Sequence, residues 1–245
     1  MGIILLLFVI LILALKNFQA RRINFSVYQE LSGNNYLKTR MDKGLYGEYK
    51  TFIALRKLPG HKVILTNLYI PRRNGSTTEI DLIMINEKGI YVFESKNFSG
   101  WIYGDETKKN WTQTFSNQKK IKFFNPIWQN NVHMNALKEV LDLHMSDFYK
   151  SYIVFSERCT LKKLYVESAN VTILKRNKLL LHIKKDMLAA GNKFTVDEVN
   201  RLESTLKRYA NATGETKEAH IQNIKQKQEP NEKVIAMVRR KQNKR

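Results

Sequence analysis

One stretch of the sequence, residues 79–101, sets the tightest limits on how this chain can fold. It contains two short runs rich in Ile, Val, Tyr and Phe, residues 80–85 and 90–93, with the cluster Asn-Glu-Lys-Gly between them. Gly89 closes that cluster, and glycine suits the positive φ that a tight turn requires. The pattern therefore predicts a β-hairpin.

Three charged side chains are expected to meet at the open end of this hairpin. Asp81 lies at the start of the first strand, and Glu94 and Lys96 lie at the end of the second. Antiparallel pairing places these strand ends side by side, and Glu94 and Lys96 point to the same face. Two carboxylates this close repel each other unless a positive charge lies between them. A divalent metal would supply that charge, with Lys96 beside it to hold a water or a phosphate oxygen.

The same triplet also permits a simpler interpretation. A carboxylate at a strand end is often only solvated, and a Glu-x-Lys pair is often an exposed ion pair that adds little stability. The surrounding sequence has to distinguish the two interpretations.

Two predicted helices carry further polar side chains that are candidates for the same site. The helix that begins at Gly44 carries Glu48 in its first turn, where the helix dipole favours a carboxylate in any case. The helix that begins at Pro126 carries Gln129 and His133 four residues apart on one face. Polar residues at a helix start are usually solvent contacts. Each is functional only if the fold places it beside the carboxylates.

Other segments have the patterns of strands and helices. Apolar runs and turn signals predict strands over residues 61–71, 101–103, 111–115, 152–155 and 171–174. Helical periodicity predicts helices over residues 178–188 and 196–209, and a capping box precedes the second.

The overall charge and the cysteine content narrow the class of protein. The formal net charge of +20 indicates a polyanionic partner, either nucleic acid or an anionic membrane surface. The single cysteine, Cys159, excludes an intrachain disulfide framework and a cysteine-based zinc cluster. One cysteine also fits a reducing compartment.

The N-terminus carries an almost unbroken apolar run over residues 2–15. This run is short for a membrane span, but Phe18 and the aliphatic stem of Lys16 extend it. Basic residues come after the run and none precedes it, which is unlike a secretory signal peptide. The positive-inside rule places the remainder of the chain in the cytoplasm. We expect residues 1–20 to form a single-pass anchor in the cell membrane, embedded through residues 2–18, with the N-terminus outside. The alternative is a buried core helix.

The two flanking segments are polar. Residues 21–42 contain a Ser-Gly-Asn-Asn breaker cluster and are expected to form a linker or a short helix. Residues 211–245 are rich in lysine and arginine and are expected to form a flexible basic tail that contacts nucleic acid or anionic lipid.

The order of these motifs resembles that of the nuclease-related domain (NERD) family, which is assigned to the PD-(D/E)xK superfamily of restriction-endonuclease-like folds. The resemblance covers residues 42–158 and is fairly specific only as a set. The residues that carry it are Gly44, Gly47-Glu48, Ile80-Asp81, Gly89-Ile90-Tyr91-Val92, Glu94-Ser95-Lys96-Asn97, Ser99-Gly100, Gly104, Trp111, Asn125-Pro126-Ile127 and Gln129-Asn130.

This resemblance implies a fold and a set of roles. The fold would be α/β (α+β), a restriction-endonuclease-like core with a central mixed sheet flanked by helices, over residues 43–210 including a C-terminal helical extension. Asp81 and Glu94 would be metal ligands, and Glu48 a further ligand or an acid behind them. Lys96 would orient the attacking water or stabilise charge on the scissile phosphate. Gln129 would position the substrate or Lys96. The cofactor would be Mg²⁺ or Mn²⁺.

The expected function is that of a membrane-anchored, cytoplasm-facing, divalent-metal-dependent nuclease that hydrolyses phosphodiester bonds of nucleic acid, with DNA as the expected polymer. The alternative is a non-catalytic nucleic-acid-binding or membrane-associated interaction module that keeps the fold. Many superfamily nucleases carry extra DNA-binding elements, whereas the additions here are an anchor and a tail. DNA binding that is sensitive to salt and survives Asp81→Ala would favour the alternative.

Overall fold

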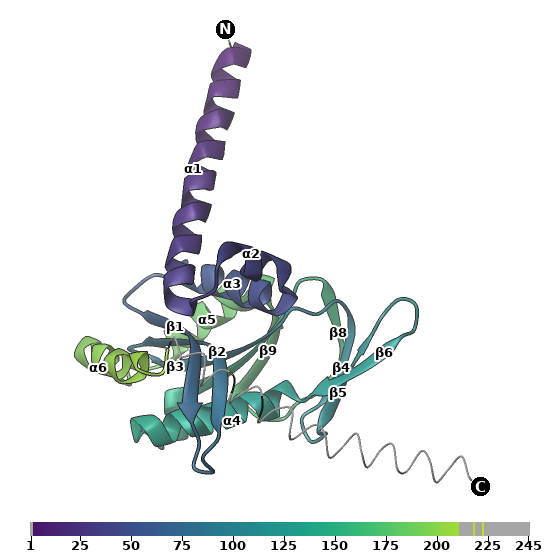
Figure 1. The fold of residues 1–245 in the computed structure, drawn as a ribbon, viewed down its shortest axis with the longest axis vertical. Helices are drawn as coiled ribbons and strands as arrows, with labels where there is room; N and C mark the ends of the chain where they lie inside the picture. The colour runs from purple at the N-terminus through teal and green to yellow at the C-terminus, as the bar shows by residue number, and fades with distance from the viewer. Residues whose placement is uncertain (1, 211–217, 219–221, 223–245) are drawn as a thin grey trace.

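The computed structural model describes residues 2–210 together with positions 218 and 222 (Figure 1). The expected basic tail, residues 211–245, otherwise lies outside the described residues. A five-stranded sheet with helices on both faces forms the main body, and a four-stranded sheet lies beside it. This arrangement confirms the predicted α/β fold class, and it adds a second sheet.

The five-stranded sheet is mixed, as predicted. Its strands are arranged in the order β1-β2-β3-β7-β9. Their bounds are β1 Val63–Pro71, β2 Thr77–Asn86, β3 Gly89–Lys96, β7 Tyr149–Phe155 and β9 Val171–Lys175. The first three pair antiparallel, and β3, β7 and β9 run parallel. The central strand β3 is buried along seven of its eight residues because helices cover both faces, and this burial explains its continuous apolar sequence.

Helices cover the two faces of this sheet in separate groups. One face packs against α4 (Pro126–Leu141) and α6 (Val196–Lys207). The other packs against α3 (Lys43–Arg56), α5 (Leu179–Ala189) and the C-terminal part of α1 (Gly2–Ser32). The sheet therefore lies between two hydrophobic cores, and only its strand ends are available for polar chemistry.

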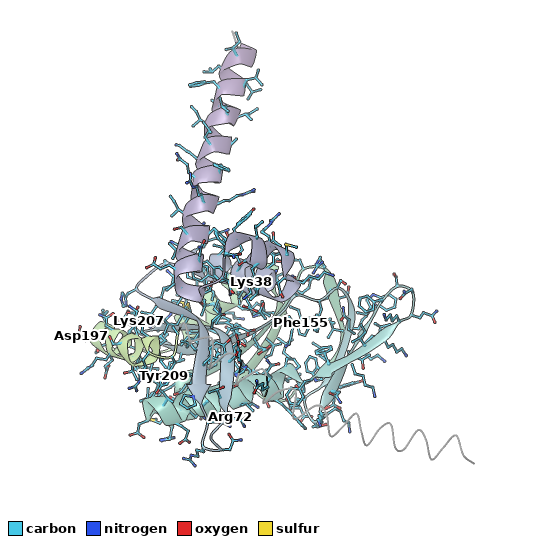
Figure 2. All side chains as sticks on the ribbon, viewed as in Figure 1. Lys38, Arg72, Phe155, Asp197, Lys207 and Tyr209 are labelled. Atoms are coloured by element: carbon cyan, nitrogen blue, oxygen red, sulfur yellow. The ribbon has the colours of Figure 1, made fainter. Side chains whose placement is uncertain are left out.

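The second sheet has the strand order β6-β5-β4-β8. Its strands are β4 (Gly100–Asp105), β5 (Asn110–Thr114), β6 (Lys120–Phe124) and β8 (Cys159–Tyr165). One face packs on a third core that includes Ile102, Trp111 and Phe155. Phe155, labelled in Figure 2, ends β7, so this core joins the two sheets. Short 3₁₀ turns at Ser146–Phe148 and Arg176–Lys178 complete the fold.

Tight packing inside the second sheet makes Gly104 sensitive to substitution. A Cβ at this position would lie 2.3 Å from Cδ2 of Trp111, whose side chain is buried. We expect Gly104→Ala to destabilise the protein by about 1–3 kcal/mol through overpacking. Thermal unfolding of the chain in detergent micelles would measure the change.

Gly191→Ala is the matched control for this prediction. A Cβ at Gly191 meets nothing within 4 Å, so its effect should stay within about 0.5 kcal/mol. Equal melting temperatures for Gly104→Ala and the parent chain would contradict the packing argument.

The N-terminal helix runs without a break into the folded domain. Tyr28, near its C-terminal end, is fully buried, and its ring centroid lies 5.1 Å from that of Tyr49 and 5.3 Å from that of Phe52. Residues 21–42, for which we expected a linker or a short helix, form the end of α1 and the short helix α2 (Tyr36–Met41). The domain's packing thus begins inside this segment.

The apolar part of α1 projects away from the rest of the molecule (Figure 2). Residues Ile4–Ser32 form a helix that is long and apolar enough to cross a membrane, and none of its most apolar stretch is buried. A signal sequence near the N-terminus would pass the same criteria. The core helix of a soluble protein is mostly buried, and the exposure of this stretch differs from that pattern.

Candidate active site

The β2–β3 hairpin places Asp81 and Glu94 at its open end. The two strands pair from Asn86 and Gly89 at the turn to Leu82 and Phe93, where the ladder stops. Continuing the register by one residue would bring Asp81 opposite Glu94. The two carboxylates therefore lie immediately beyond the last backbone pair.

An irregularity in the neighbouring strand coincides with Asp81. The β1–β2 register holds on both sides, at Thr66–Leu82 and Leu68–Ile80, but Asn67 between them has a φ of 52°. A residue in the left-handed region interrupts the ladder and increases the local twist. This interruption leaves the backbone at Asp81 outside the regular pairing, between the buried residues Ile80 and Leu82.

Glu94 is the most enclosed charged group of the site, with 1% of its side chain exposed. Its Oε1 lies 2.6 Å from Nζ of Lys96, and its Oε2 lies 3.1 Å from Nε2 of His133. Burial alone would raise the pKa of Glu94, but the charge of Lys96 and the hydrogen bond from His133 outweigh it, and the pKa is lowered. Glu94 is therefore an ionised carboxylate.

Helix α4 supplies two side chains to this cluster. The Lys96 ammonium donates to Oε1 of Gln129 at 3.1 Å, so it is held between Glu94 and Gln129. The Nδ1 of His133 lies 2.9 Å from Oγ1 of Thr78, and this contact fixes the imidazole ring against Glu94. The burial of Lys96 lowers its pKa, but Glu94 and the other nearby carboxylates outweigh that effect, and the pKa is raised.

Asp81 and Glu48 are less fully compensated. Burial, followed by the charges of Glu94 and Glu48, raises the pKa of Asp81 well above its ordinary value. Burial, followed by the charges of Glu79 and Glu94, raises the pKa of Glu48 to about 8. The backbone N–H of Ser95 lies 3.4 Å from Oδ2 of Asp81, which is long for a hydrogen bond. Asp81, Glu94 and Glu48 thus share one electrostatic environment.

Close packing of α3 against the end of β3 explains why Glu48 reaches this environment. A Cβ on Gly47 would lie 2.7 Å from Cβ of Asn97, so only glycine allows the helix to approach the residue after Lys96 this closely. On the same side, Oγ1 of Thr51 lies 3.3 Å from Oγ of Ser95. In the Gly-Glu pair of the sequence motif, Gly47 therefore allows α3 to approach the end of β3, and Glu48 supplies a carboxylate there.

The donor set fits a hard divalent cation. Asp81, Glu94 and Glu48 offer carboxylate oxygens, which Mg²⁺ and Mn²⁺ prefer, and one lysine does not balance three carboxylates. The raised pKa values of Asp81 and Glu48 come first from burial and then from repulsion by neighbouring carboxylates, which a cation would relieve. Among the described residues, no group of three His, Cys, Asp or Glu side chains lies close enough together to hold a metal ion as it stands. Both oxygens of Glu94 are engaged by Lys96 and His133.

Sequence reasoning assigned roles to five residues of this region, but it did not predict the contacts that His133 and Thr78 make. The structure brings Glu94, Lys96 and Gln129 into direct contact, and Asp81 and Glu48 interact with them electrostatically. His133 was a candidate because it shares a predicted helix face with Gln129, but the sequence assigned no role to it. Thr78 carries no sequence signal, because a threonine in a strand is usually structural.

Comparison with known proteins agrees with this geometry. The sequence profile of the nuclease-related domain family matches residues 43–156. An uncharacterized protein of Bacillus anthracis is 35% identical to this chain over 167 residues, which cover 68% of this chain and 76% of that protein. The chain belongs to the nuclease-related domain family. No solved structure matches it.

Membership in this family has direct consequences for the site. The nuclease-related domain covers both strands of the hairpin, helix α3 and the site residues of α4, and it is consistent with a restriction-endonuclease-like core. The chain thus carries a nuclease-like domain. For such a domain, nucleic acid is the indicated substrate, and use of a divalent metal is usual.

Proposed function

We propose that this protein is a divalent-metal-dependent nuclease that hydrolyses phosphodiester bonds of DNA. The observation that carries the proposal is the meeting of Glu94, Lys96 and Gln129 next to Asp81 and Glu48 at one end of the nuclease-related hairpin. A buried Glu94 with two half-buried acids around a lysine has no evident structural benefit, because burying charges costs stability. Such a cluster is expected where phosphate chemistry takes place.

The side chains divide the chemistry among them. Asp81, Glu94 and Glu48 would hold Mg²⁺ or Mn²⁺, which when bound supplies positive charge for the phosphate oxygens and lowers the pKa of water. Lys96 stabilises the negative charge that develops on the phosphate, or orients the attacking water. Gln129 holds the Lys96 ammonium in place, and His133 fixes the Glu94 carboxylate.

The proposal includes a location. Helix α1 would cross the cell membrane once, with the nuclease-related domain on the cytoplasmic side. Lys16, Arg21 and Arg22 come after the apolar run, and no basic residue precedes it. The positive-inside rule favours this orientation. Protease treatment of intact and opened cells would test it, because a cytoplasmic domain is protected only in intact cells.

Metal dependence is the direct test of the proposed activity. We expect the full chain in detergent micelles to cleave DNA with Mg²⁺ or Mn²⁺ and to lose at least about 100-fold of its rate in excess chelator. Glu48→Gln should lower the rate at saturating metal, since it removes one carboxylate oxygen donor. The appearance of cleaved oligonucleotide on a gel would measure both effects.

Glu139→Gln makes the same chemical change at an exposed surface pair with Arg73, and its cleavage rate should equal that of the parent. A rate that chelator does not alter would refute the metal requirement. One observation favours the non-catalytic alternative, namely that both Glu94 oxygens already have protein partners. That alternative predicts DNA binding with no cleavage under any metal condition.

A further inference from the structure

The second sheet has one face that the nuclease site does not use. Its inward face packs on the core through Ile102, Trp111, Leu161 and Leu164. Side chains alternate along a strand, so their neighbours point outward. The outward face carries Trp101, Tyr103, Lys120, Lys122, Lys162 and Lys163, and we name it the aromatic–lysine face.

The strand register arranges this face in two rows. In one row, Tyr103 of β4 pairs with Lys163 of β8 on one side and with Thr112 of β5 on the other, and Thr112 pairs with Lys122 of β6. The register of β4 and β8 shifts after Ile102, so Lys162 and Lys163 both lie between the inward residues Leu161 and Leu164. An aromatic ring thus lies between lysines that approach from both edges of the sheet.

The second row repeats the arrangement one step along the strands. Trp101 pairs with Thr160 of β8 and with Thr114 of β5, and Thr114 pairs with Lys120 of β6. The Trp101 side chain is 43% exposed, and Nζ of Lys162 lies 5.4 Å from its ring centroid. This is a large exposed aromatic ring beside a cation.

The charges of this face are not neutralised within the protein. Its four lysines form no salt bridge with any acid in the part of the chain that the structure describes. The acids at the end of β4 have other partners, since Asp105 accepts from Thr107, and Glu106 accepts from the N–H groups of residues 167 and 168. A polyanion is the complementary ligand for such a surface.

The sheet that carries the aromatic–lysine face is connected to the candidate active site at two places. Strand β4 begins at Gly100, four residues after Lys96. At the other edge, Phe124 of β6 lies edge-on to Trp128, with ring centroids 6.2 Å apart, and Trp128 precedes Gln129. The first connection leads to Lys96, and the second leads to Gln129, which accepts from the Lys96 ammonium.

We propose that the aromatic–lysine face binds single-stranded nucleic acid, with bases stacked on Trp101 and Tyr103 and phosphates held by the flanking lysines. Partly exposed aromatic rings beside cations are an arrangement that recognises unpaired bases along a charged backbone. A duplex hides its base faces, and an acidic protein would use the lysines without requiring the rings. The inference rests on the proposed function, because it names an unpaired strand as the form in which substrate is bound.

The test measures binding separately from cleavage. Anisotropy of a labelled oligothymidylate of about 20 nucleotides, with the full chain in neutral detergent micelles and excess chelator, gives the dissociation constant at several salt concentrations. Trp101→Ala combined with Tyr103→Ala should weaken binding at least about 10-fold. Lys122→Gln combined with Lys163→Gln should reduce the slope of log affinity against log salt by about 1.4.

Two controls make the result specific. Lys184→Gln combined with Lys185→Gln removes the same charge from the exposed surface of α5 and should leave the affinity and the salt slope within error of the parent. Trp101→Phe keeps a ring for stacking and should retain most of the affinity, which guards against a loss caused by misfolding.

The outcomes separate this inference from the proposed activity. Unchanged binding in both face variants would overturn the inference, as would equally tight binding of a duplex of the same length. Weakened single-strand binding in the face variants would support the inference even if the parent chain cut no nucleic acid. A lack of cutting would refute only the proposed nuclease activity. If the parent chain cleaves nucleic acid but the face variants bind the single strand as tightly as the parent, the nuclease proposal stands and the inference about the face is refuted.

Discussion

Asp81→Asn should abolish cleavage and, in metal-free solution, raise the stability of the protein. The rate should fall at least about 1000-fold, because the substitution removes a charged oxygen donor from the site where phosphate charge develops. Stability should rise because burial and the charges of Glu94 and Glu48 already disfavour an ionised Asp81. An amide of the same shape removes that repulsion. Oligonucleotide cleavage and thermal unfolding in chelator would measure the two effects.

Asp197→Asn is the control for both measurements. Asp197, labelled in Figure 2, is exposed in the first turn of α6, far along the chain from the site. Its replacement should leave cleavage unchanged and lower stability by no more than about 1 kcal/mol, the usual effect of an acid at a helix start. Equal cleavage by the parent and Asp81→Asn would show that a contaminant, not this site, is responsible.

Lys96→Gln should cost both activity and stability. The Glu94 side chain is 1% exposed and its closest cation is the Lys96 ammonium, 2.6 Å away. Removal of one member of a buried ion pair leaves an uncompensated charge and typically costs about 3–5 kcal/mol. Cleavage should fall at least about 100-fold, since no other lysine contacts Glu94 or Gln129 in the described structure. Denaturant unfolding would measure the stability change.

A second substitution separates the two losses. Glu94→Gln combined with Lys96→Gln removes both charges and should recover most of the lost stability while cleavage stays absent. Lys207→Gln removes a lysine from an exposed pair with Glu203 and should cost less than about 1 kcal/mol. If Lys96→Gln were no less stable than Lys207→Gln, the Glu94–Lys96 pair would not be the buried interaction described above.

Local sequence signals were sufficient for most of the elements. The Asn125 side chain accepts from the N–H of Ile127 at the start of the helix predicted from Pro126, and Thr195 and Glu198 form the predicted capping box. The hairpin was predictable because its strands are apolar and its turn contains glycine. These features depend on residues a few positions apart, which a sequence displays directly.

Two strands of the second sheet were not predicted, for a physical reason. Strands β6 and β8 alternate or mix lysine with apolar residues, and each lies at an edge of its sheet. An edge strand with a solvated face buries little, so it lacks the apolar run that marks β3. The continuation of α1 into the domain was also not predicted. The polar composition of this segment conceals the spacing of Phe25, Tyr28 and Leu31 on one face.

The site was only partly predictable. Strand pairing allowed the placement of Asp81 opposite Glu94, because a short turn leads to antiparallel geometry. The contacts of Gln129 and His133 required the position of α4 across the sheet. That position depends on the packing of Met134 and Leu137 in the core, which no local pattern specifies.

The unbroken α1 determines how far the domain can stand from a bilayer. A helix of 31 residues is about 47 Å long, and the hydrocarbon layer takes about 30 Å of that length. The last turns of α1 are already buried in the domain at Tyr28. If α1 spans the membrane, no flexible linker separates the bilayer from the domain. The folded domain would then lie close to the lipid headgroups. Under the proposed function, cutting would be confined to a thin layer beside the bilayer.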